Sequence, residues 1–112
     1  MSETKDFFTT HAQEMAKVQT AAPEVVRSFG SFFMTVIKDG ALSTKMKELI
    51  ALGIALSERC EPCIRLHVQK SLEAGATKEE IMEAASVAVL MRGGPAYTHL
   101  PMIIETLEMC SR

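Results

Sequence analysis

Proline and glycine divide this sequence into helix-sized segments, and this division constrains the fold more than any other feature. Between the breaks, apolar residues recur every three or four positions, and no convincing alternation of polar and apolar residues argues for strands. The sequence therefore predicts an all-α fold of about six helices. Its 112 residues suffice for one hydrophobic core, so we expect a single domain over residues 1–112.

The first two helices are expected from apolar spacing and one proline. A weakly amphipathic helix should run from about Asp6 to Gln19. Pro23 suits the first position of a second helix, which should end at Asp39-Gly40. This second helix carries a stripe of aromatic residues, interpreted as core or subunit interface: Phe29, Phe32 and Phe33.

The next two helices should form a central antiparallel hairpin. Ser43 can cap a third helix that is apolar on almost every side from Leu49 to Leu56, as expected of a helix enclosed by neighbours or by other subunits. A fourth helix should begin near Cys60, because Pro62 is tolerated only in a first turn, and should end at Gly75.

Two further helices complete the prediction. Thr77 and Glu80 form a capping-box sequence for a fifth helix, which Gly93-Gly94-Pro95 should stop. A last helix should reach the carboxyl terminus, and Pro101 either kinks that helix or marks its start.

Composition excludes several classes of function. The net charge of −2, with scattered Lys and Arg, makes nucleic acid an unexpected partner. No apolar run approaches the roughly 20 residues of a membrane-spanning helix, and the polar amino terminus leads into no secretory core. The odd count of three cysteines suits a reducing compartment, so we expect a cytoplasmic protein.

Two of the cysteines, Cys60 and Cys63, form a C-x-x-C pair at the predicted start of the fourth helix. A thiol reacts as its thiolate, which the positive end of a helix favours. The spacing also brings both sulfurs to one side of the first turn, within reach of a disulfide. This pattern predicts a redox-active pair, whereas the third cysteine, Cys110, is interpreted as a packing or incidental thiol.

Two further residues could manage protons for this pair. His67 lies one helical turn after Cys63 on the same face, so its imidazole can serve as a base. If the third and fourth helices form a hairpin, Glu48 is nearly as far from the turn as His67, and its carboxylate would orient that imidazole. The ordinary alternative for Glu48 is a surface ion pair with Lys45 or Lys47.

The arrangement of Glu48, Cys60-x-x-Cys63-x-x-x-His67 and a following Ala-Gly-Ala resembles the carboxymuconolactone decarboxylase superfamily, in its alkylhydroperoxidase D-like branch. The match covers a core of about residues 44–95. The resemblance implies a homo-oligomer, often a hexamer, that reduces hydroperoxides without a cofactor or metal. It further implies that Cys63 attacks the peroxide and Cys60 resolves the intermediate, while Glu48 and His67 relay protons and a lipoyl-bearing or thioredoxin-like dithiol protein regenerates the pair.

One position departs from the family pattern, because Pro62 stands where its best-characterised peroxidases carry a second histidine. Two arguments about which cysteine is the nucleophile point in opposite directions. The helix start alone favours Cys60 as thiolate, whereas the nearness of His67 favours Cys63, which we prefer.

Two rival functions remain open at this point. One is a cofactor-free lactone decarboxylase, the reaction that names the superfamily, which needs acid and base groups but not two thiols. The other is a binding module in which the pair senses redox state or holds zinc, with a fourth ligand from His11, His99 or Cys110.

Overall fold

The computed structural model describes residues 3–110, and over this range the chain is all-helical, as predicted. Six helices have eleven residues or more, and a seventh is a single four-residue turn. They are α1 (Glu3–Ala21), α2 (Pro23–Ile37), α3 (Thr44–Ser57), α4 (Glu61–Glu73), α5 (Lys78–Arg92), α6 (Gly94–Tyr97) and α7 (Leu100–Cys110). Pro101 lies in the first turn of α7, so this proline marks the start of the last helix and kinks nothing.

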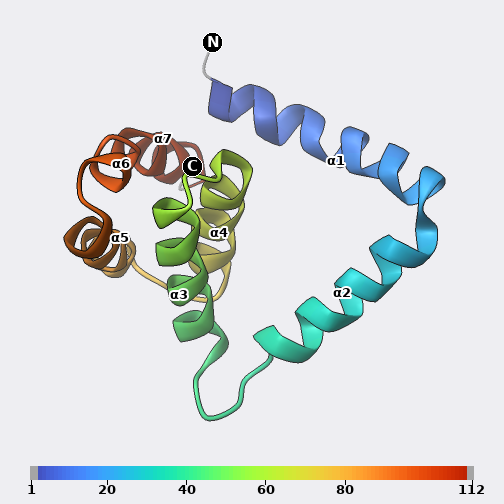
Figure 1. Ribbon diagram of the computed structural model, residues 1–112, viewed down its shortest axis with the longest axis horizontal. Coiled ribbons are helices and arrows are strands. Elements are labelled where there is room, and N and C mark those ends of the chain that lie inside the picture. The colour runs from blue at the N-terminus through green and yellow to red at the C-terminus, as the bar shows by residue number, and fades with distance from the viewer. Residues whose placement is uncertain (1–2, 111–112) are drawn as a thin grey trace.

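The helices divide into a packed body and a projecting arm (Figure 1). In the body, α3 and α4 form the predicted hairpin, α5 packs on α3, and α7 packs on α4. Aliphatic side chains from these helices fill the core, the largest being Leu52, Leu56, Ile64, Val68, Ile81 and Ile103. Their burial supplies most of the driving force for folding.

The arm consists of α1 and α2, which meet at a corner away from the body (Figure 1). The only buried residue of α1 is Thr4, and α2 has none. Within a single chain, two residues of the aromatic stripe of α2 are therefore not core, since Phe29 and Phe32 are about two-thirds exposed, at 66% and 65%. The arm also raises the radius of gyration to 14.4 Å, above the roughly 13 Å of a compact domain of similar length.

Polar contacts at its two ends fasten the arm to the body. At the amino end, the Thr4 hydroxyl donates to Glu105 of α7 at 2.8 Å and accepts from Nε of the buried Arg65 of α4 at 3.0 Å. At the carboxyl end, Nζ of Lys47 in α3 donates to the carbonyls of Val36 and Lys38, at 2.8 and 2.7 Å. These carbonyls end α2 and lack helical partners, so the lysine satisfies them.

The predicted capping residues start α3 and α5. The Ser43 hydroxyl accepts from the Met46 amide, and Thr77 and Glu80 form a complete capping box. Glu80 also forms an ion pair with Lys45 at 3.0 Å. The backbone amide of Thr77, and then the ammonium of Lys45, favour the charged carboxylate and hold the pKa of Glu80 below its usual range. These contacts link the start of α3 to that of α5.

Helices α3 and α4 end in the same way. In each case a left-handed residue follows the last turn, and two backbone N–H groups turn back to the final carbonyls. At the end of α4 this residue is Gly75, with φ of 98°, whereas at the end of α3 it is Arg59, with φ of 55°. A side chain makes this conformation costly, so Arg59 is strained in the segment that leads into Cys60.

These two positions give reciprocal stability predictions. Gly75→Ala should lower the free energy of unfolding by about 1–2 kcal/mol through backbone conformation alone, because a Cβ there meets no atom within 4 Å. Arg59→Gly should raise it by a smaller amount, about 0.5–1 kcal/mol, since glycine also gains freedom in the unfolded chain. Both changes in free energy can be measured from the midpoints of urea unfolding curves, provided that the dependence on urea concentration is the same for each variant. Equal stability of Gly75→Ala and wild type would contradict this account.

Across residues 3–110, no helix is both long enough and apolar enough to cross a membrane.

Candidate redox site

The candidate site begins where the chain passes from α3 into α4. The left-handed Arg59 turns the chain, and the Cys60 amide then donates to the Ala55 carbonyl of α3 at 3.1 Å. Cys60 is the residue that caps α4, and its own carbonyl accepts from Ile64 at 2.8 Å. The strained end of α3 thus fixes the position of the first cysteine.

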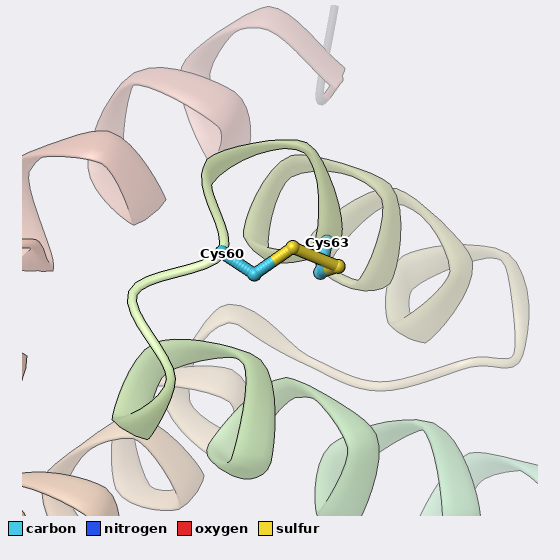
Figure 2. Close-up of a disulfide and its surroundings, with 2 residues drawn as sticks. All are labelled: Cys60 and Cys63. Atoms are coloured by element: carbon cyan, nitrogen blue, oxygen red, sulfur yellow. A yellow bond between two sulfur atoms is a disulfide. The ribbon is translucent and has the colours of Figure 1, made fainter.

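The second cysteine follows in the first turn of α4 and is bonded to the first. Cys60 and Cys63 form a disulfide (Figure 2), with their Cα atoms 5.2 Å apart. Both residues are partly exposed. This Cα separation lies within the usual range for disulfides. Pro62 lies between them in the first turn, where its missing N–H removes no helical hydrogen bond. The predicted proximity of the two sulfurs is therefore observed.

The hairpin also brings Glu48 and His67 together, as their distances from the turn predicted. Oε1 of Glu48 lies 2.7 Å from Nδ1 of His67. Glu48 is buried, with 3% of its surface exposed, and the His67 side chain is 18% exposed. An ionised carboxylate can only accept a hydrogen bond, so Nδ1 carries the proton, and the lone pair of a neutral imidazole is left on Nε2.

The surface alternative for Glu48 is not what the structure contains. Lys45 pairs with Glu80, and Lys47 donates to the last carbonyls of α2. Glu48 instead points into the hairpin, where a buried carboxylate requires a polar partner. His67 supplies that partner.

Cys110 lies at the end of α7, apart from the C-x-x-C pair, and is a free thiol. Burial, assisted by the negative charge of Glu73, raises the pKa of this thiol above its usual value. A thiol that stays protonated is a poor nucleophile. This chemistry agrees with the interpretation of Cys110 as a packing residue.

The zinc alternative requires a cluster of four ligand side chains. No group of three or more His, Cys, Asp or Glu side chains that could hold a metal ion occurs within residues 3–110. Of the candidate fourth ligands, His11 stacks on Phe7 of its own helix, and Nδ1 of His99 lies 2.7 Å from the Pro95 carbonyl.

Sequence reasoning missed one neighbour of the site. The ring of Phe33, from α2, lies parallel to the His67 imidazole, with an interplanar angle of 21° and 6.3 Å between ring centroids. Lys70 of α4 places its ammonium 5.2 Å from the centroid of the same ring. The sequence showed only that Phe33 belongs to an aromatic stripe, because its contact depends on how α2 returns to the body.

Comparisons with known proteins agree with this geometry. Residues 23–101 match the model of the carboxymuconolactone decarboxylase family. The chain belongs to this family. The resemblance noted in the sequence is thereby confirmed at the level of the family.

Relatives and solved structures extend the match to nearly the whole chain. An uncharacterised protein of the cox locus of Paracoccus denitrificans is 36% identical, over 84% of this chain and 85% of its own. A crystal structure of a family member from Legionella pneumophila superposes with a TM-score of 0.92 at 33% identity, covering both chains fully. A family protein of Thermotoga maritima, for which involvement in an antioxidative response has been suggested, is 29% identical with a TM-score of 0.80, covering 91% of this chain and 87% of its own.

The hydrogen bond between Glu48 and His67 yields a stability prediction. Glu48→Ala removes the acceptor of the His67 N–H and should lower the free energy of unfolding by about 1–3 kcal/mol, the usual cost of an unsatisfied buried group. Glu14→Ala, an exposed glutamate in the middle of α1, is the matched control and should change it by less than about 0.5 kcal/mol. Denaturant unfolding measures both variants. Equal stability of the two would show that the Glu48–His67 contact contributes nothing to the fold.

Proposed function

We propose that this protein is a thiol-dependent peroxidase of the alkylhydroperoxidase D-like branch. One observation carries the proposal: a Cys60–Cys63 disulfide at the start of α4, one helical turn before a histidine held by a buried carboxylate. The two sulfurs supply the electrons of the reaction. The Glu48–His67 pair supplies and accepts its protons.

In the proposed reaction the imidazole of His67 takes the proton of the Cys63 thiol, and the thiolate attacks the peroxide. The O–O bond breaks, Cys63 becomes a sulfenic acid, and the proton returns to the leaving alkoxide to give an alcohol. The Cys60 thiol then attacks the sulfenic sulfur and releases water, which forms the disulfide. Two electrons have passed from the two thiols to the hydroperoxide.

A dithiol must then reduce the disulfide by thiol–disulfide exchange, becoming oxidised itself. We propose a lipoyl-bearing or thioredoxin-like protein for this role, because its own two thiols can complete the exchange. Partial exposure of both cysteines supports access by such a partner. A reducing compartment such as the cytoplasm suits the cycle, since the resting pair is there kept as thiols.

Thiol counting tests the proposal. Reduced protein has three thiols per chain, and one equivalent of hydroperoxide should remove two of them, leaving Cys110. Cys63→Ser should lose none, and Cys60→Ser should stop at a sulfenic acid that a dimedone-type reagent traps. Cys110→Ser is the matched control and should form the disulfide as wild type does. Retention of all three thiols in wild type would refute the peroxidase, and sulfenic acid on Cys60 would reverse the two cysteine roles.

The same cysteine variants distinguish the proposed peroxidase from the rival function, a lactone decarboxylase. A lactone decarboxylase needs no thiol, so a Cys60→Ser, Cys63→Ser double variant would keep that activity, whereas a thiol peroxidase loses all of its turnover. The partly exposed C-x-x-C pair favours the peroxidase.

We also propose that the chain functions as a homo-oligomer, the hexamer implied by its family resemblance. Two apolar surfaces of the single chain support self-association. One is the exposed face of α2, which includes Val25, Phe29, Phe32 and Val36. The other is a groove of about 780 Å³ between α3 and α5, whose lining includes Ile50, Ile54, Val87 and Met91. Burial of these apolar side chains would favour association, and a second copy offers a helix for the groove.

Sedimentation equilibrium tests the assembly. The wild-type mass should be a multiple of the 12.3 kDa chain, six-fold for a hexamer. Ile54→Asp places a charge in the groove and should shift the mass toward the monomer, because an unpaired charge is costly to bury between copies. Glu14→Asp, on α1 outside both surfaces, is the control. A monomeric wild type would refute the assembly without affecting the chemistry of the cysteines.

A further inference from the structure

We propose that Phe33 is a positioning residue for the proton relay, so that the packing of α2 on the body sets how well His67 serves Cys63. This inference rests on the proposed function, since it assigns a role within the same site. It starts from the parallel contact between the Phe33 ring and the His67 imidazole.

Phe33 differs from the other apolar residues of its helix. Phe29, Phe32 and the adjacent Met34 are all about two-thirds exposed, whereas Phe33 is partly buried against α4. Its ring contacts two α4 side chains spaced by three residues, His67 and Lys70. Side chains with this spacing lie on one face of a helix, so a single ring can contact both.

The position of that ring is fixed by contacts near the end of α2. Lys47 donates to the carbonyls of Val36 and Lys38, and the hydroxyl of Thr44 donates to the Ile37 carbonyl at 2.8 Å. Phe33 lies one helical turn before Ile37. The contacts of α3 with the end of α2 therefore also place Phe33 over His67.

One hydrogen bond is not enough to fix the orientation of the His67 imidazole. The hydrogen bond to Glu48 fixes one ring atom, Nδ1, but leaves the ring able to tilt about that atom. A flat ring lying parallel to the imidazole restricts this tilt and keeps water from one of its faces. Both effects hold Nε2, the basic nitrogen, in one orientation toward its proton donor.

Two charged side chains take part in these contacts, Glu48 of α3 and Lys70 of α4, and α2 contributes an uncharged ring. The ammonium of Lys70 lies over the Phe33 ring, an attractive arrangement that helps to hold the ring in place. Phe33 therefore acts through His67 by geometry and exclusion of water, and adds no charge to the relay.

The test measures the reactivity of Cys63 directly, without peroxide. In reduced Cys60→Ser protein, the rate of Cys63 alkylation by iodoacetamide against pH reports its thiolate, with Cys63 resolved from Cys110 by peptide mass. Phe33→Ala should lower the rate at neutral pH by about tenfold, a part of what a positioned base contributes. Met34→Ala, the adjacent exposed residue, is the matched control and should leave the rate unchanged.

Two further measurements separate positioning from a merely structural role. NMR relaxation of the His67 ring should show a more mobile imidazole in Phe33→Ala than in wild type, with Nδ1 still protonated in both because Glu48 still accepts its hydrogen bond. With His67→Gln already present, Phe33→Ala should cause no additional loss of alkylation rate, because the residue acts through the imidazole. Phe33→Leu keeps an apolar side chain without the flat ring, so its Cys63 alkylation rate should lie between the rates of wild type and Phe33→Ala. If Phe33→Ala does not fold, Phe33→Leu replaces it in every measurement.

An unchanged alkylation rate and an unchanged mobility of the His67 ring in the folded Phe33 variants would overturn the inference. So would a rate loss that persists in full when His67 is already Gln. Failure of the peroxidase proposal would look different, because peroxide would then remove no thiols from wild type while the alkylation rates still depended on Phe33.

Discussion

The hydrogen bond between Glu48 and His67 is the interaction on which the arrangement of the site depends. It joins the two helices of the central hairpin at a buried point, with 2.7 Å between the carboxylate oxygen and the ring nitrogen. A carboxylate is costly to bury without a partner, so α3 and α4 must align in the register that brings His67 to Glu48. The same register places the start of α4, with both cysteines, at the end of α3.

The local backbone then determines how the first cysteine is presented. The end of α3 repeats the hydrogen-bonding pattern that ends α4, but with Arg59 where α4 has Gly75. A left-handed arginine costs stability that a glycine would not, and it adjoins the segment that carries Cys60. Strain of this kind persists only where the surrounding structure holds it, and here the hairpin, the caps and the core of α3 and α4 do so.

The arm adds a second layer of organisation around this hairpin. Its amino end is held by Thr4 against Arg65 and Glu105, and its carboxyl end by Lys47. Between these attachments the apolar face of α2 stays open in the single chain, while Phe33 reaches the histidine of the site. The helix proposed to join copies of the chain therefore also contacts the proposed relay, so assembly and chemistry share one structural element.

The sequence by itself determined the helices, their caps and the cysteine pair, because these depend on local spacing: Ser43, Thr77, Pro62 and Gly75 act within a turn or two. It also predicted the Glu48–His67 contact, since residues equally distant from a tight turn must face each other. Only the tertiary structure decided which α2 ring meets His67 and that the rest of the stripe is exposed, and it alone showed that Pro101 begins a helix. These outcomes depend on the angle at which α2 returns to the body and on packing between segments far apart in the chain, and no local pattern encodes either.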